Sequence, residues 1–217
     1  MSKNSHLVRE KILDRALELF NEQGIEYIGV RELAKDLGTK PGNITYYFPT
    51  KDDIVLAVGE RLSALNNETI RLPEQPSLLH YLQMIRQSFD NHYKFRCLFY
   101  SQPNLMRQNE KLAEGYIGNV EKERRRTLKD YFTTLRNKRF LVDSLSDKDM
   151  DVMVSMVAII ARSWIGDASI SFRDKDVEWC KAHYLNIVSN YIAGYSTPKG
   201  LAEIRTFSSE TVSSLPA

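Results

Sequence analysis

The stretch between Gly38 and Lys51 is rich in side chains that can bind an anion or the edge of a base. It contains two lysines and no aspartate or glutamate. Hydroxyl, amide and phenol groups stand between the lysines, and such groups donate hydrogen bonds to phosphate oxygens and to bases. The candidates are Arg31, Thr39, Lys40, Gly42, Asn43, Thr45, Tyr46, Tyr47 and Lys51. Their chemistry favours nucleic-acid binding.

The pattern around these residues predicts two short helices joined by a tight turn. Gly38 directly follows the first apolar stripe, and Pro41 suits the first position of the next helix, where its missing N–H costs nothing. The second helix should close at Phe48, because Pro49 pushes the residue before it out of the helical region. The side chains expected to lock the two helices together are Leu33, Ala34, Leu37, Ile44 and Phe48.

Such a helix-turn-helix is narrow enough for its second helix to enter the roughly 12 Å wide major groove of DNA. The competing interpretation is a helical hairpin with only a structural role. Among the aromatic residues that end the second helix, Phe48 is expected in the core, whereas Tyr46 could lie inside or outside.

Longer helices are expected on both sides of this unit. Before it, apolar residues recur at steps of three, four and one from Val8 to Phe20, with Ser5 as a cap and Gly24 as the end. After it, a helix should begin behind Thr50 and run to about residue 70. Asp52 and Asp53 in its first turn favour the positive end of the helix dipole.

The run from Ile12 to Val58 closely resembles the DNA-binding region of the TetR family of repressors. Three features match together: the Ala16/Leu19-Phe20/Gly24 spacing, the Val30–Ala34 helix, and Gly38 through Phe48-x-x-Lys51. The resemblance covers about residues 8–58. Over the remaining three-quarters of the chain only length and helicity agree.

The resemblance implies a role for each candidate. Gly42 would let the recognition helix approach the DNA backbone. Lys40, Asn43 and Thr45 would face the groove and set sequence preference. The residues expected to donate to phosphates are Arg31, Tyr46, Tyr47 and Lys51, with Tyr47 and Lys51 carrying most of the affinity.

Two positions depart from the family pattern. A serine or threonine commonly caps the recognition helix where Lys40 stands, so either Thr39 takes that task or the helix starts one residue early. A tyrosine is common where this chain has Thr45. These changes put the operator sequence in doubt, not the fold.

The rest of the chain also reads as helix, so the expected class is all-α. We expect helices at about 77–100, 104–137, 147–170 and 174–195, with Gly115 and Gly118 as candidates to split the second. The expected domains are a DNA-binding domain at 1–50, an effector-binding and dimerisation domain at 51–195, and a partly disordered tail at 196–217.

Two further sets of residues are expected in the larger domain. In the resembled family this domain encloses an apolar effector pocket, and the candidates for its lining are Met84, Phe89, His92, Phe95, Phe99, Met106 and Trp164. The last two long helices would form an isologous dimer interface, with Val157, Ile160, Trp164, Tyr184, Val188 and Tyr191 as candidates. Each aromatic pocket candidate, taken singly, is more typical of ordinary core packing, and only the set as a whole favours a pocket.

Composition excludes several function classes. The chain has 217 residues, a formal net charge of +2 and two cysteines, so no disulfide framework or four-cysteine zinc site is available. No metal-ligand spacing, cofactor motif or catalytic motif occurs, and an enzyme is not expected. No apolar run approaches the roughly 20 residues that span a bilayer, so the expected setting is the cytoplasm without a membrane partner. The basic run at 121–139 reads as a solvated helix face or a second nucleic-acid patch.

The expected function is a dimeric repressor that binds palindromic double-stranded operator DNA and is released by a small-molecule effector. Two alternatives remain. One is a DNA-binding regulator that needs no effector. The other is a helical ligand-binding protein that has lost DNA binding, for which Thr45 is the best argument.

Overall fold

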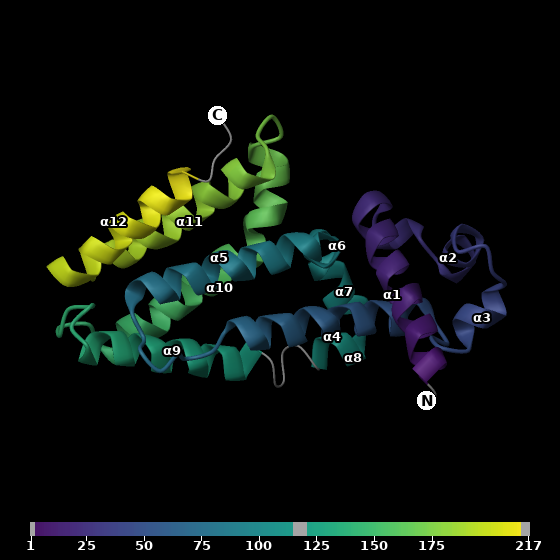
Figure 1. The fold of residues 1–217 in the computed structure, drawn as a ribbon, viewed down its shortest axis with the longest axis horizontal. Coiled ribbons are helices and arrows are strands. Elements are labelled where there is room, and N and C mark those ends of the chain that lie inside the picture. The colour runs from purple at the N-terminus through teal and green to yellow at the C-terminus, as the bar shows by residue number, and fades with distance from the viewer. Residues whose placement is uncertain (1–2, 115–120, 214–217) are drawn as a thin grey trace. The chain divides into compact units, whose positions relative to one another are not determined.

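The computed structural model describes residues 3–114 and 121–213, and these residues are almost entirely helical (Figure 1). The only β pairing among them is an isolated bridge between Leu141 and Ser196. The elements are α1 (Lys3–Gln23), η1 (Ile25–Tyr27), α2 (Val30–Asp36), α3 (Pro41–Thr45), α4 (Lys51–Thr69), α5 (Leu78–Lys94), α6 (Arg96–Tyr100), α7 (Gln102–Gln108), α8 (Glu110–Glu114), α9 (Glu121–Asn137), α10 (Asp147–Ser171), α11 (Val177–Ala193) and α12 (Pro198–Ser213). The all-α class is confirmed.

The chain divides into two compact units that do not follow the expected boundaries. Unit 1 contains the residues up to Leu65 together with 94–118, and unit 2 contains 66–93 and the chain from 119 onward. Helix α4 therefore contributes Lys51–Leu65 to unit 1 and Asn66–Thr69 to unit 2. A sequence read in order suggests contiguous domains, whereas packing joined α6–α8 to the N-terminal helices.

Unit 1 is built on the apolar face of α1. Leu13, Ala16 and Phe20 are almost completely buried, as their spacing predicted. Near the end of α1 the Asn21 side-chain amide binds the segment that contains Lys94 and Cys97. It donates to the Lys94 carbonyl at 2.9 Å and accepts from the Cys97 backbone N–H at 3.1 Å. A residue distant in sequence thus becomes part of the unit.

Helix α4 starts where the sequence predicted. Thr50 is the N-cap, and the Thr50 and Asp53 side chains form a reciprocal capping box. Asp53 accepts from the Thr50 backbone N–H at 2.9 Å, and the Thr50 hydroxyl accepts from the Asp53 N–H at 3.2 Å. This cap fixes the residue at which α4 begins, a few residues after the end of the recognition helix.

The range 104–137, which was expected to be split, contains more than one helix. The described part of this range contains α7, α8 and α9, and Asn109 separates the first two in an extended conformation. Gly115 and Gly118, the two candidate break points, lie outside the described residues.

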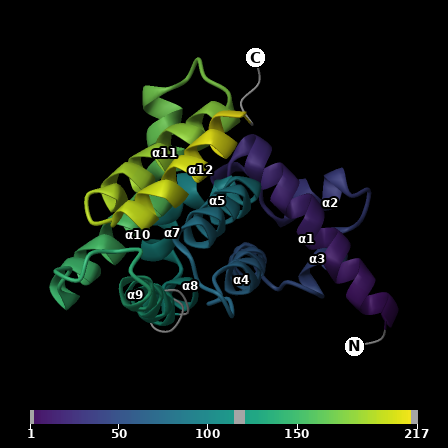
Figure 2. The same ribbon diagram turned by 60° about the vertical axis from the view of Figure 1, so that its left-hand side comes forward.

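The tail was expected to be partly disordered, and for Pro198–Ser213 this is wrong. These residues form α12, which runs alongside α11 in both views (Figures 1 and 2). Ile204, Phe207 and Thr211 are buried. Their spacing of three and four residues was the signal that the serine- and threonine-rich composition obscured.

The start of α12 is held by a segment far back in the chain. The Thr197 N–H and hydroxyl donate to the Phe140 and Arg139 carbonyls at 3.0 and 2.7 Å. At Gly200 an added Cβ would lie 2.2 Å from the Phe140 oxygen, so this close approach requires glycine. Contacts across some 60 residues therefore order a segment that looks unstructured when read alone.

Helix α10 has 25 residues and an 18-residue window of mean hydropathy 1.3, so length and composition alone would permit a membrane span. The core helix of a soluble protein passes the same test. Arg162 within α10 pairs with Glu121 at 2.6 Å, and a third of the window is buried inside the protein. These contacts favour a core helix.

Candidate nucleic-acid interface

The two short helices form the predicted helix-turn-helix. Leu33, Ala34, Ile44 and Phe48 are at most 2% exposed, and Leu37 packs against the same core. The predicted interlocking of α2 and α3 is therefore confirmed. Between the helices Gly38 adopts φ +64°, a left-handed conformation that costs other residues about 1–2 kcal/mol.

The recognition helix α3 starts at Pro41 without a side-chain cap. Lys40 is the N-cap residue and makes no side-chain cap hydrogen bond, so Thr39 does not take that task. The Thr39 hydroxyl instead accepts a hydrogen bond from the Asn43 amide nitrogen at 2.7 Å. This bond fixes the orientation of the Asn43 side chain before any ligand arrives, and sequence reasoning missed it.

The residues of α3 and its N-cap that were predicted to contact DNA face solvent. Lys40, Gly42, Asn43 and Thr45 are all exposed. The Thr45 hydroxyl donates to the Gly42 carbonyl at 3.3 Å, so this substitution is accommodated on the surface without disturbing the core.

The aromatic residues behind α3 divide by burial. Tyr46 is 78% exposed, Tyr47 is partly buried and packs against the core, and Phe48 is buried. The two tyrosine rings meet edge to face at 5.0 Å. The structure thus resolves Tyr46 as a surface residue and confirms Phe48 as core.

Two basic residues flank the recognition helix. Arg31 is exposed on α2. The Lys51 ammonium at the start of α4 donates to the Glu26 carbonyl at 3.2 Å. An ammonium has three N–H donors, so two remain for a phosphate.

Several carboxylates on α1 and α2 are paired with arginines. Arg61 on α4 binds Glu10 and Asp14 of α1, and Arg15 binds Asp36 at 2.5 Å. Partial burial opposes ionisation of Glu10, but the hydrogen bond and charge of Arg61 outweigh it and lower the pKa of that carboxyl. These three carboxylates are therefore compensated by arginine charge, and the stretch from Gly38 to Lys51 adds no carboxylate of its own.

Gly42 allows a direct test of close approach to DNA. A Cβ added at Gly42 would have no heavy atom within 4 Å, so Gly42→Ala should fold and gain about 0.5–1 kcal/mol of helix stability. We nevertheless expect DNA affinity to fall about tenfold, because the methyl group would occupy space that the helix needs beside the duplex.

Thermal denaturation and DNA titration of the same preparation measure the two effects. Gly38→Ala is the control, since its positive φ should make that variant less stable by about 1 kcal/mol. A Gly42→Ala protein that binds DNA like the wild type would contradict the role assigned to Gly42.

The seven candidate pocket residues do not gather in one unit. Met84, Phe89, His92 and Trp164 lie in unit 2. Phe95 is buried in the core of unit 1, and Phe99 and Met106 pack against that same core. Spacing along one aromatic-rich stretch could not reveal that the chain changes units at Lys94.

Within unit 2 the Phe89 and Trp164 rings stack at 5.2 Å with an interplanar angle of 3°. The indole N–H of Trp164 is buried and has no hydrogen-bond partner among the described residues. A buried donor without an acceptor is uncommon and calls for an explanation.

A buried polar network surrounds His92. Its Nδ1 lies 3.0 Å from the Ala161 carbonyl, which can only accept, so Nδ1 carries the proton and Nε2 accepts from the Asn66 amide at 3.3 Å. Asn91 donates to Asn66 at 3.1 Å and to Thr69 at 3.1 Å. The network joins the end of α4 to α5 and α10.

Burial, with a smaller contribution from the charge of Arg124, lowers the pKa of His92 to about 3. The imidazole is therefore neutral at physiological pH, which agrees with the tautomer required by its hydrogen bonds. Sequence analysis selected His92 but missed Asn66 and Asn91, since no local pattern distinguishes buried asparagines.

Four of the six candidate interface residues are buried inside unit 2. Val157, Trp164, Tyr184 and Val188 are at most 6% exposed, whereas Ile160 and Tyr191 are intermediate. The four buried residues are unavailable to a second subunit in this arrangement. The exposed apolar side chains of the same helices are Val152, Met156, Ile159, Ile170 and Ile187.

The basic run at 121–139 contains several intramolecular ion pairs. Arg125 pairs with Glu121 at 3.0 Å, and Lys129 pairs with Asp151 at 2.8 Å. These pairs favour the interpretation as a solvated helix face. In the described part of the chain no group of three or more metal-ligating side chains comes together.

Two family models match the chain. Residues 12–58 match the model described as bacterial regulatory proteins of the tetR family, and residues 59–204 match TetR, described as a bacterial transcriptional repressor. A curated relative, an uncharacterised HTH-type transcriptional regulator YvdT of Bacillus subtilis, is 32% identical over 62 residues. That match spans 29% of this chain and 32% of the relative.

Solved structures share the fold. A TetR-family regulator from Marinobacter aquaeolei superposes with a TM-score of 0.85 at 20% identity, covering 97% of this chain and 99% of the other. A putative regulator from Saccharomonospora viridis in complex with choline gives 0.69 at 17% identity, covering 86% and 98%. FadR from Bacillus subtilis in complex with stearoyl-CoA gives 0.61 at 19%, covering 82% and 96%. The helix-turn-helix, the helical remainder and both family matches agree: this chain belongs to the TetR family, whose members are transcriptional regulators and not enzymes.

Proposed function

We propose that this regulator is a cytoplasmic repressor that binds palindromic operator DNA as a homodimer and releases it when a small molecule binds. The observation that carries the proposal is the exposed, acid-free side of α3 with Lys40, Asn43 and Thr45 on a firmly packed helix-turn-helix. The residues that contact DNA phosphates would be Arg31, Tyr46, Tyr47 and Lys51. The contacts to bases would come from α3.

Titration of the protein with duplex DNA at several salt concentrations tests DNA binding. The duplexes are a random 30-base-pair sequence and the best sequence enriched from a randomised pool. Affinity should fall steeply with salt, because each neutralised phosphate releases a condensed counterion. Absence of binding to either duplex at low salt would refute the proposal.

Lys51→Ala should weaken binding to both duplexes by a similar factor, about fivefold, and make the salt dependence shallower by about one counterion. Lys51 would contact phosphate only, so the ratio of the two affinities should stay unchanged. Lys94→Ala, an exposed lysine at the other end of the same unit, is the control. A changed ratio would instead place Lys51 at a base edge.

Dimerisation would use the exposed apolar face of α10 and α11. Val152, Met156 and Ile159 recur at steps of four and three on α10, and Ile187 adds to the surface on α11. Surplus exposed apolar surface on a helix commonly serves an isologous contact. Light scattering should give twice the chain mass of 25.1 kDa, and a monomer at micromolar concentration would contradict this part.

An effector is supported by the unpartnered indole N–H of Trp164 in an aromatic environment. A ligand with an acceptor oxygen beside an apolar group could satisfy this donor. The neighbours in complex with choline and with stearoyl-CoA show that proteins of this fold hold ligands of very different chemistry.

Helix α4 would transmit the effect, because its two ends belong to different units. A ligand shifts DNA affinity only if it binds the released state more tightly, and a nearly complete shift needs about 10⁴-fold discrimination, roughly 5.5 kcal/mol. Candidate ligands are titrated against the DNA complex. A ligand that quenches Trp164 fluorescence but leaves DNA affinity unchanged would favour a regulator that needs no effector.

A further inference from the structure

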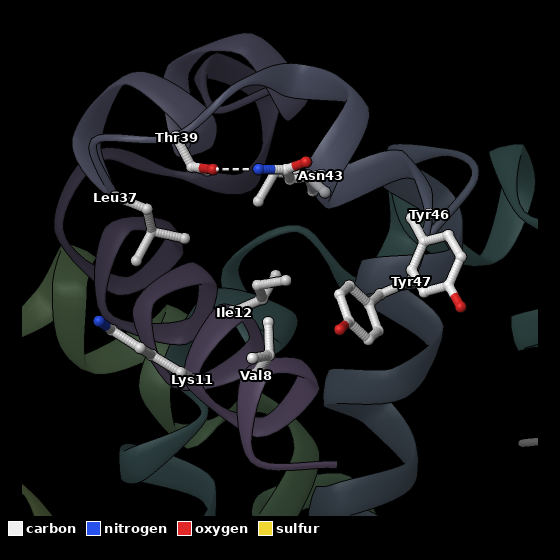
Figure 3. A pocket seen from close by; sticks show the side chains of 9 residues that line it. Val8, Lys11, Ile12, Leu37, Thr39, Asn43, Tyr46 and Tyr47 are labelled. Carbon is white, nitrogen blue, oxygen red and sulfur yellow. Dashed lines mark hydrogen bonds between the residues drawn. The ribbon is translucent and has the colours of Figure 1, made fainter. Parts of the chain in front are cut away.

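A hollow of about 390 Å³ lies beside the recognition helix, between α1 and the turn into α3 (Figure 3). Val8, Lys11 and Ile12 line it from α1. Thr39 and Asn43, joined by their hydrogen bond, line the opposite edge. Figure 3 shows Lys11 on the same side as Leu37, while Tyr46 and Tyr47 lie on the other side. All of these residues belong to unit 1.

The lining combines an apolar floor with hydrogen-bond donors and contains no carboxylate. The Thr39 oxygen accepts from Asn43, so the Thr39 hydroxyl proton is left to donate outward. The Tyr47 phenol is turned toward the hollow, whereas the Tyr46 hydroxyl points away from it (Figure 3). This set of donors suits an anionic partner that also has an apolar part.

Lys11 differs from the other described cations of α1. Arg9 pairs with Glu10 at 3.3 Å, and Arg15 pairs with Glu18 and Asp36. Lys11 is exposed, and no carboxylate of the described residues lies within the 4 Å of an ion pair. Its neighbours Glu10 and Asp14 are held by Arg61. Lys11 thus presents an uncompensated positive charge at the rim.

The position of the hollow relative to a duplex follows from the stripe that lines it. Thr39 before α3, Asn43 within it and Tyr47 after it all line the hollow, which therefore runs along one flank of the recognition helix. A helix lying in the major groove has a sugar–phosphate backbone along each flank. One backbone would therefore pass over this hollow.

We propose that the hollow seats the DNA backbone, with the Lys11 ammonium on a phosphate and Val8 against the adjacent deoxyribose. The inference rests on the proposed DNA binding and adds α1 to an interface otherwise made by α2, α3 and the start of α4. Charge complementarity and continuity with the exposed face of α3 both favour a phosphodiester as occupant.

Lys11→Gln and Lys94→Gln form a matched pair for the test, since each removes one charge from an exposed lysine of unit 1. Asn21, at the far end of α1, binds the Lys94 carbonyl, and ten residues of helix separate Asn21 from Lys11 by about 15 Å. The random 30-base-pair duplex is a sufficient probe, because a phosphate contact does not depend on sequence.

We expect Lys11→Gln to weaken binding about fivefold and to reduce the slope of log affinity against log salt by about 0.9, the value for one phosphate. Lys94→Gln should change neither. Equal behaviour of the two variants would overturn the inference while leaving the proposed function standing. Failure of the wild type to bind duplex at all would instead refute the proposed function itself.

Val8→Asp adds an independent arm. Val8 is 39% exposed, so the new carboxylate can stay hydrated, and its charge beside the hollow should weaken binding tenfold or more at low salt. Thermal denaturation verifies that the variant is folded. Val8→Thr, similar in shape and uncharged, should bind within twofold of the wild type. A folded Val8→Asp protein with unchanged DNA affinity would also overturn the inference.

The phosphate itself can be located with the enriched duplex. Single phosphates are replaced in turn by neutral methylphosphonates, and each duplex is titrated with wild type and Lys11→Gln. At one position the methylphosphonate should lower the affinity of the wild type for the duplex. The same substitution should leave the affinity of Lys11→Gln unchanged, because this variant already lacks the contact to that phosphate. If instead inorganic phosphate protects Lys11 from acetylation and DNA does not, the hollow binds a free anion and the inference is wrong.

Discussion

Replacing Asn43 with alanine is expected to reduce discrimination between the enriched duplex and a scrambled one by about 10- to 100-fold. An asparagine that contacts adenine through both its oxygen and its nitrogen is worth about 1–3 kcal/mol of discrimination. The hydrogen bond to Thr39 at 2.7 Å uses one N–H and leaves the oxygen and the second N–H for the base. Affinity for the scrambled duplex should hardly change, because phosphate contacts remain.

Thr39→Val provides the matched control for this prediction. It keeps the shape of the side chain but removes the oxygen that orients Asn43. Discrimination should fall by less than in Asn43→Ala, because the amide is still present but must pay its ordering entropy on binding. Equal loss of affinity for both duplexes in Asn43→Ala would show that Asn43 contacts the backbone and not a base.

Replacing His92 with leucine is expected to lower the free energy of unfolding by about 1–3 kcal/mol. The substitution removes the acceptor of the buried Asn66 amide, and a buried polar group left without its partner costs about this much. The Ala161 carbonyl loses its bond to His92 but keeps its intrahelical partner in α10. Urea denaturation followed by tryptophan fluorescence measures this, because both tryptophans, Trp164 and Trp179, belong to unit 2.

A second variant separates the network from simple loss of packing. His80 lies on the exposed side of the same helix, and His80→Leu should change stability by less than about 0.5 kcal/mol. Asn66→Leu combined with His92→Leu should cost less than the sum of the two single changes, since each single variant orphans the partner of the other. Additive costs would mean that the two side chains act independently.

The same network predicts a pH dependence. The pKa of His92 is about 3 in the folded protein and near 6.5 in the unfolded chain, so between these values the unfolded state binds one more proton. Stability therefore falls as pH drops below 6.5, by about 1.4 kcal/mol per unit for this group. His92→Leu should remove that slope between pH 6 and 5. An identical slope in both proteins would contradict the neutral, buried histidine.

If the network holds, it has a consequence for regulation. Asn66 and Thr69 lie in the part of α4 that belongs to unit 2, whereas Lys51, the proposed phosphate contact, lies at the other end in unit 1. Hydrogen bonds that fix the end of α4 to α5 and α10 would make its position sensitive to changes in unit 2. Effector response and stability should therefore change together in His92 and Asn66 variants.

Sequence alone determined the helix-turn-helix. Short-range interactions specify this unit: Gly38 takes the left-handed turn, Pro41 starts α3, and the apolar stripe of α2 meets Ile44 and Phe48 within twenty residues. The contact candidates on α3 follow from the same periodicity, because residues that are not locked inward on so short a helix must face outward. The sequence pattern was sufficient to predict this unit because the contacts that hold it together join residues close in the chain.

Only the tertiary structure decided which faces of the later helices are inside. Helices α10 and α11 are apolar on more than one side, so their periodicity did not show that Trp164 and Tyr184 face the core while Met156 and Ile159 face solvent. The same holds for Asn66, which meets His92 across 26 residues. Burial is set by partners far away in the chain, and a pattern within one helix carries no information about which of its faces those partners will cover.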